Sequence, residues 1–136
     1  MYAALDLGTN KCRLLIARPT RRGFHVIDAF SRIVRLGEGV TATGLLSETA
    51  MTRAIDALRV CNTKINRQKV SSAKLVATEA CRIASNGPAF IDRVRDELGL
   101  DIEILSREEE AKLAVCGCAS LIDLDCDHAM VFDIGG

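Results

Sequence analysis

The chain begins with two apolar runs that are separated by a short polar turn. Residues 3–7 (AALDL) and 12–17 (CRLLIA) are typical of buried β-strands, and the turn between them, residues 8–11, reads GTNK. Asp6 lies inside the end of the first run. A carboxylate in an apolar strand is costly unless it is paired, hydrogen-bonded or bound to a metal ion. A plain hairpin does not need this carboxylate, so the feature predicts a strand–turn–strand unit with a functional acid beside the turn.

The size and composition are those of one globular domain. The chain has 136 residues, of which 49% are hydrophobic and 26% charged. Lys and Arg together number 18, as do Asp and Glu, so the charge balance gives no sign of a nucleic-acid partner. We find neither an apolar run long enough for a membrane span nor a targeting segment. Six cysteines at apolar positions, without a CxxC pair, predict buried thiols in a reducing cytoplasm.

The order of predicted elements indicates an α/β fold. Three strands come first, and residues 21–23 join the second and third as an antiparallel hairpin. A glycine-rich loop, residues 36–44, precedes a helix that begins at the N-cap Ser47. A second helix follows Asn86 and ends at Gly99, and a third begins at the capping box of Ser106. The predicted strands are residues 3–7, 12–18, 24–34, 73–78, 101–105 and 129–133, which predicts a mixed β-sheet covered by helices.

The two ends of the chain carry similar turns. Residues 5–10 read LDLGTN and residues 132–136 read FDIGG, so each has an acid, an apolar residue and a glycine after a strand. Backbone N–H groups in a tight glycine turn can bind phosphate, and an acid at a strand end can hold Mg²⁺. Two such loops that face each other would bind a phosphate chain and its metal from both sides.

The segments LDLGTNKCRLLIA, RLGEGV, VATEACRIASNG, EILSREEEAKLA and VFDIGG resemble, in this order, those of the Ppx/GppA phosphatases. This family comprises exopolyphosphatases and guanosine pentaphosphate phosphohydrolases. The resemblance implies a ribonuclease-H-like domain of the actin-like ATPase superfamily, with a mixed sheet and helices on both faces. It places this first domain at residues 1–124. Residues 125–136 would be the first strand and phosphate loop of a second domain that continues beyond this sequence.

The resemblance also implies roles for individual residues. It assigns phosphate binding to the two glycine turns and Mg²⁺ binding to the two acids beside them. Arg82 would contact phosphate, although from its position alone it could equally be a solvated residue at a strand–helix turn. The full set is catalytic Glu110 and Arg82, phosphate-binding Gly8, Thr9, Asn10, Gly135 and Gly136, and metal-binding Asp6 and Asp133. Lys11 departs from the small or amide residue expected in this turn, so it either contacts the polyanion or faces solvent.

Three consecutive glutamates at the start of the third helix can be separated physically, because successive helical residues lie about 100° apart. Glu109 stands three residues after Ser106, so we expect it to complete the capping box. Glu108 favours the positive end of the helix and solvent. Glu110 lies above small residues of the same helix face and matches the catalytic glutamate that the resemblance implies.

The resulting hypothesis is a hydrolase that releases orthophosphate from the end of inorganic polyphosphate, or from guanosine pentaphosphate (pppGpp). Glu110 would orient the attacking water. The alternatives are an ATP-dependent kinase of the same fold and a non-catalytic sensor of polyphosphate or alarmone. We expect residues 1–136 to be inactive alone, and the resemblance implies a homodimer for the complete protein.

Overall fold

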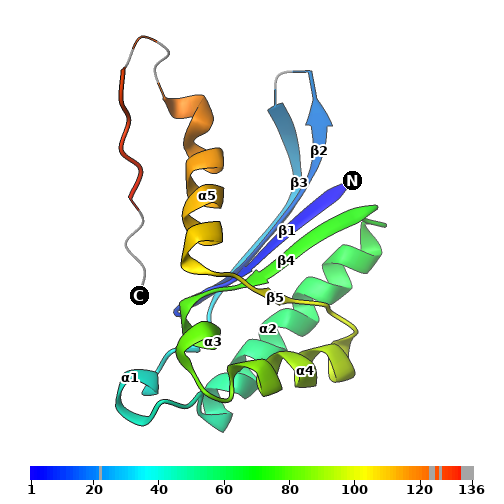
Figure 1. The fold of residues 1–136 in the computed structure, drawn as a ribbon. Helices are drawn as coiled ribbons and strands as arrows, with labels where there is room; N and C mark the ends of the chain where they lie inside the picture. Colours follow the sequence, from blue (N-terminus) through cyan, green and yellow to red (C-terminus); the bar gives the residue numbers. More distant parts are fainter. Residues whose placement is uncertain (22, 123–124, 126, 133–136) are drawn as a thin grey trace.

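A computed structural model describes residues 1–21, 23–122, 125 and 127–132. Its centre is a five-stranded sheet in the order β3-β2-β1-β4-β5 (Figure 1). The strands are β1 (Tyr2–Leu7), β2 (Lys11–Thr20), β3 (Gly23–Ile33), β4 (Ser72–Ala77) and β5 (Glu103–Ile104). The helices are α1 (Val40–Thr43), α2 (Glu48–Arg67), α3 (Glu79–Ile83), α4 (Gly87–Leu98) and α5 (Arg107–Cys118), followed by a 3₁₀ turn at Ala119–Leu121. The mixed α/β class predicted from the sequence is confirmed.

β1 is the central strand and pairs on both sides. It runs antiparallel to β2, with Leu7 opposite Cys12, and parallel to β4, with Leu7 opposite Ala77. Leu5 and Leu7 are buried, and the alternation of buried and exposed residues shows that β1 presents one face to the core. Because β1 and β4 are parallel and in register, the loop after β1 and the segment after β4 emerge at the same edge of the sheet.

Helices α2 and α4 cover one face of the sheet, whereas α5 lies on the other side of the strands (Figure 1). The core joins the inward residues of β1 and β2 to the apolar stripe of α2, with Leu58 and Cys61 fully buried, and to Phe90 of α4. The predicted caps are present: the Ser47 side chain accepts a hydrogen bond from the Ala50 amide, and Gly99 ends α4 with a φ of 66°. In the part of the chain that the structure describes, no helix combines the length and hydropathy of a membrane span.

Some local predictions were wrong. The glycine-rich loop contains the short helix α1, and α3 was not predicted at all. Residues 129–132 form no strand, because a strand needs a neighbour for its backbone hydrogen bonds and none of the described strands lies beside this segment. Cys116 is exposed and Cys118 half-buried, because α5 has no buried residue. The domain boundary predicted at residue 124 lies outside the described residues, and residues 1–124 as one domain stay a prediction.

Candidate active site

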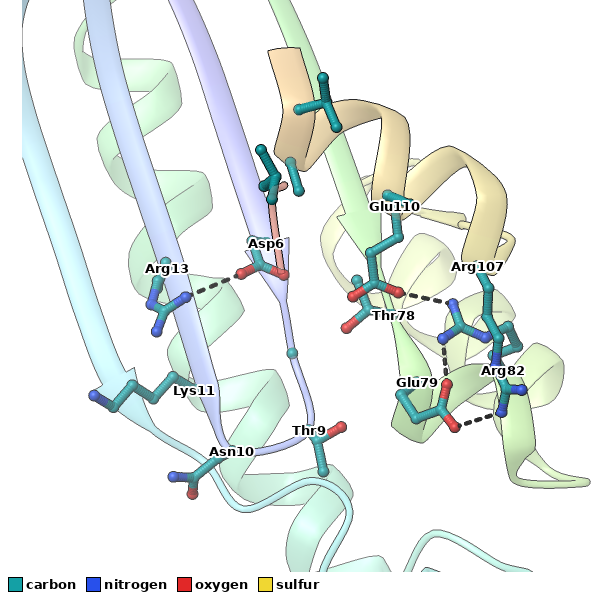
Figure 2. A pocket seen from close by; sticks show the side chains of 15 residues that line it. Asp6, Thr9, Asn10, Lys11, Arg13, Thr78, Glu79, Arg82, Arg107 and Glu110 are labelled. Carbon is teal, nitrogen blue, oxygen red and sulfur yellow. Dashed lines mark hydrogen bonds and ion pairs between the residues drawn. The ribbon is translucent and has the colours of Figure 1, made fainter. Parts of the chain in front are cut away.

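A cleft of about 770 Å³ lies at the edge of the sheet where β1 and β4 end. The loop after β1 forms one wall, and α3 with the first turns of α5 forms the other (Figure 2). Polar and charged residues from β1, β2, α3, α5 and the loops after β1 and β4 line it: Asp6, Thr9, Asn10, Lys11, Arg13, Thr78, Glu79, Arg82, Arg107 and Glu110. Six of the residues that the sequence predicted for the site, Asp6, Gly8, Thr9, Asn10, Arg82 and Glu110, are therefore brought together.

The loop after β1 is held by backbone hydrogen bonds. The Gly8 amide donates to the carbonyl oxygen of Lys11 at 2.9 Å. The sequence had suggested that this amide binds an anion, but in the structure its hydrogen is already used. The carbonyl of Thr9 accepts from the Gly37 amide at 3.0 Å, which ties the loop to the segment before α1. The amides of Thr9 and Asn10 donate to no acceptor in the described part of the chain. These two N–H groups are the ones that the loop can offer to a phosphate.

Asp6 lies beside this loop. Its Oδ2 is 3.6 Å from Nη1 of Arg13, its neighbour on β2. A Cβ atom on Gly8 would lie 3.8 Å from Oδ1 of Asp6, which is an ordinary van der Waals contact. The Asp6 side chain is 41% exposed and lines the cleft.

Arg82 is the most heavily bonded cation of the cleft. Its Nη1 donates to the carbonyl oxygen of Leu105 at 2.6 Å and to Oε2 of Glu110 at 3.1 Å, while Nη2 donates to Oε2 of Glu79. Nε is buried without a partner in the described chain, and the side chain is only 19% exposed. The alternative of a solvated Arg82 is therefore wrong. Burial opposes the charge, but the hydrogen bonds to Glu79 and Glu110 raise the pKa of Arg82 above its usual value.

The three glutamates of α5 differ as the sequence predicted. Glu109 completes the capping box, because its Oε2 accepts from the Ser106 amide at 2.9 Å. These hydrogen bonds from the Ser106 backbone and hydroxyl lower the pKa of Glu109. Glu108 is exposed, whereas Glu110 is half-buried and lines the cleft, where it accepts from Arg82 (Figure 2). Only Glu110 of the three can act on a ligand in the cleft.

The sequence analysis missed two site residues, Glu79 and Arg107. Oε1 of Glu79 accepts from Nη2 of Arg107 at 3.0 Å, and Oε2 accepts from Arg82. These hydrogen bonds, first that from Arg107 and then that from Arg82, lower the pKa of Glu79. Both residues lie inside motifs that were recognised, VATEACRIASNG and EILSREEEAKLA, but the short helix α3, which positions Glu79, was not predicted. The spacing of Glu79 three residues before Arg82 was a usable signal.

The predicted residues Asp133, Gly135 and Gly136 lie outside the described residues. Among those that are described, no group of three side chains of the ligand-forming types is positioned to hold a metal ion. Asp6 is thus the only one of the two predicted metal ligands whose surroundings are known. Metal binding by Asp6 and Asp133, and phosphate binding by the second glycine turn, stay predictions.

The fold and the cleft define a class of protein: a mixed α/β domain that combines a glycine turn at the end of its first strand with a half-buried arginine and a helix-borne carboxylate. Residues 15–136 match the model of the Ppx/GppA phosphatase family. The chain belongs to this family.

Solved structures agree with this assignment. The Ppx/GppA family member of Aquifex aeolicus is 36% identical with a TM-score of 0.82, over 87% of this chain and 39% of that one. An exopolyphosphatase from Cytophaga hutchinsonii is 30% identical with a TM-score of 0.83, over 88% of this chain and 38% of that one. The ethanolamine utilization protein EutJ of Carboxydothermus hydrogenoformans, at 17% identity and a TM-score of 0.50 over 83% of this chain and 39% of that one, shares the fold alone, which is consistent with an actin-like ATPase fold. The chain thus spans about two fifths of the length of these relatives.

Proposed function

We propose that the full-length protein is a phosphoanhydride hydrolase that releases orthophosphate from the end of inorganic polyphosphate or from pppGpp. The observation that carries the proposal is the pair of Glu110 and Arg82, which faces the glycine turn after β1 across one cleft. Membership of the phosphatase family and the similarity to an exopolyphosphatase support the same reaction.

In this proposal Glu110 orients and deprotonates the attacking water. Arg82 donates to Oε2 of Glu110 at 3.1 Å, which fixes the position of this carboxylate at the cleft wall. The terminal phosphate binds both the amides of Thr9 and Asn10 and the guanidinium group of Arg82, so its phosphorus lies between the loop after β1 and the wall that carries Arg82 and Glu110. Phosphoryl transfer depends mostly on such positioning and on neutralising charge at the phosphate oxygens.

We also propose that Mg²⁺ takes part through Asp6. Carboxylate, water and substrate oxygens are the ligands that Mg²⁺ prefers, and the Asp6 side chain is 41% exposed at the cleft. Bound there, Mg²⁺ would neutralise phosphate charge and orient the substrate. A homodimeric, cytoplasmic full-length protein is a further prediction of the family resemblance.

The test is orthophosphate release by the full-length protein with Mg²⁺, offered long-chain polyphosphate and pppGpp in parallel. Release that depends on Mg²⁺ supports the proposal, and the ratio of kcat/KM values identifies the preferred substrate. Binding of either substrate without release supports the sensor alternative. Phosphate transfer from ATP to a second substrate, without polyphosphate hydrolysis, supports the kinase alternative.

A further inference from the structure

The carboxylate of Glu79 lies in the cleft at a position that an anionic ligand could also occupy. Its carboxylate lies between two guanidinium groups, and each of its oxygens accepts from a different arginine, Oε1 from Arg107 and Oε2 from Arg82 (Figure 2). Two arginines that donate to the oxygens of one anion are also an arrangement in which proteins bind a phosphate group. The ionised state of Glu79 follows from these contacts, since both lower its pKa.

The donors of Arg82 show what a phosphate has to displace. A guanidinium has five N–H donors, and both hydrogens of Nη1 in Arg82 are directed to acceptors of the protein, Leu105 and Glu110. Nε is buried, so an anion in the cleft does not reach it without a rearrangement. The remaining group, Nη2, is bound to Glu79. Arg82 can therefore donate both hydrogens of Nη2 to the substrate only when its hydrogen bond to Glu79 is broken.

Arg107 is the second arginine of this arrangement. It is the first residue of α5, its side chain is 73% exposed, and it lines the same cleft as Arg82. Glu79 is 38% exposed, so neither member of this ion pair is fixed by burial. An exposed ion pair contributes little to stability and is exchanged easily for another partner.

We propose that Glu79 occupies the place of a phosphate between Arg82 and Arg107, that the terminal phosphate of the substrate displaces it, and that Arg107 is a second phosphate-binding residue. This inference rests on the proposed function, because it names how the same cleft takes up its anionic substrate. Glu79 then weakens binding of phosphate in two ways. It competes for the donors of both arginines, and it adds a negative charge to a cleft that receives a polyanion.

The test compares phosphate binding by variants of the full-length protein. Titration calorimetry with orthophosphate measures Kd, and initial rates with polyphosphate measure KM and kcat. Glu79→Gln should lower the Kd for orthophosphate about three- to tenfold, and Arg107→Gln should raise it about threefold, since one charge-assisted hydrogen bond is involved in each and that of Arg107 is solvent-exposed. Because a freed Arg107 would bind phosphate more fully, its substitution should cost more in the E79Q background than in the wild type.

Two matched controls separate these effects from the general loss of a charge. Glu97 and Arg95 also form ion pairs on the surface, Glu97 with an arginine one turn earlier and Arg95 with two aspartates, but neither lines the cleft. Glu97→Gln and Arg95→Gln should leave Kd unchanged. Thermal unfolding of all five variants, the double variant included, checks that each is folded.

The inference is overturned if E79Q binds orthophosphate no more tightly than E97Q, or if R107Q binds as well as R95Q. A higher Kd for orthophosphate in E79Q would show that Glu79 only positions Arg82. Wild-type protein that binds no orthophosphate would also overturn the inference. The rate of phosphate release tests the proposed function separately. If the Kd values shift as expected but no phosphate is released from polyphosphate or pppGpp, the anion site is supported and the hydrolase function is rejected.

Discussion

Glu110→Gln is the substitution that tests the proposed chemistry most directly. Glutamine has the shape of glutamate and its Oε1 can still accept from Arg82, so the wall of the cleft should be preserved. Arg82 also keeps its contacts with the Leu105 carbonyl and Glu79, so we expect the free energy of unfolding to fall by about 1 kcal/mol or less. The loss of a general base costs about 10²- to 10⁴-fold in rate, which corresponds to about 3–5 kcal/mol of activation free energy. We therefore expect kcat for phosphate release to fall at least about 100-fold.

The assay is the initial rate of orthophosphate release by the full-length protein at saturating substrate and Mg²⁺. KM should not rise in E110Q, because the substitution removes a negative charge from a cleft that binds a polyanion. The neighbouring glutamate provides a matched control: Glu108 is exposed on the same helical turn, so Glu108→Gln should retain the wild-type rate. A kcat within about threefold of wild type in folded E110Q, well short of the loss expected for a general base, would refute the role of Glu110 as the base.

Three further predictions follow from local geometry. A Cβ on Gly37 would lie 2.3 Å from Cγ2 of Thr9, so Gly37→Ala should displace the loop after β1 and lower kcat/KM. Gly117→Ala should retain activity, because its Cβ meets no atom of the described chain within 4 Å; equal kcat/KM values for the two variants would contradict this prediction. Lys64 of α2 donates to both carboxylate oxygens of Asp28 and lowers the pKa of Asp28 below its ordinary 3.8. This ion pair therefore stabilises the protein above that pH. At pH 7 the Tm of Asp28→Asn should therefore be lower than that of wild type. This difference in Tm should disappear as the pH falls through the lowered pKa of Asp28, and a difference that persists in acid would point to another cause. A thiol reagent should modify Cys116 in the native protein before the three buried cysteines of the described chain, and mass spectrometry of the labelled peptides would reveal any other order.

The sequence by itself determined most of the local structure. Apolar runs of strand length predicted β1, β2 and β4, because such side chains have to be buried on the core face of a sheet, and the turn at residues 21–23 predicted β3 as the hairpin partner of β2. Ser47, Ser106 and Gly99 fixed helix ends, because a side-chain acceptor or a left-handed backbone satisfies the end of a helix locally. The separate roles of Glu108, Glu109 and Glu110 also followed from helical geometry alone.

Only the tertiary structure decided which residues share the cleft. Arg82 and Glu110 are 28 positions apart, and they meet because β4 lies parallel to β1 and α5 returns to the edge where both strands end. The same arrangement placed Arg107 against Glu79 and used the Gly8 amide inside the loop. It also left residues 129–132 without a neighbouring strand in the described chain, although their composition is that of a strand. Contacts between distant segments depend on how the elements pack, and no pattern within either segment encodes its partner.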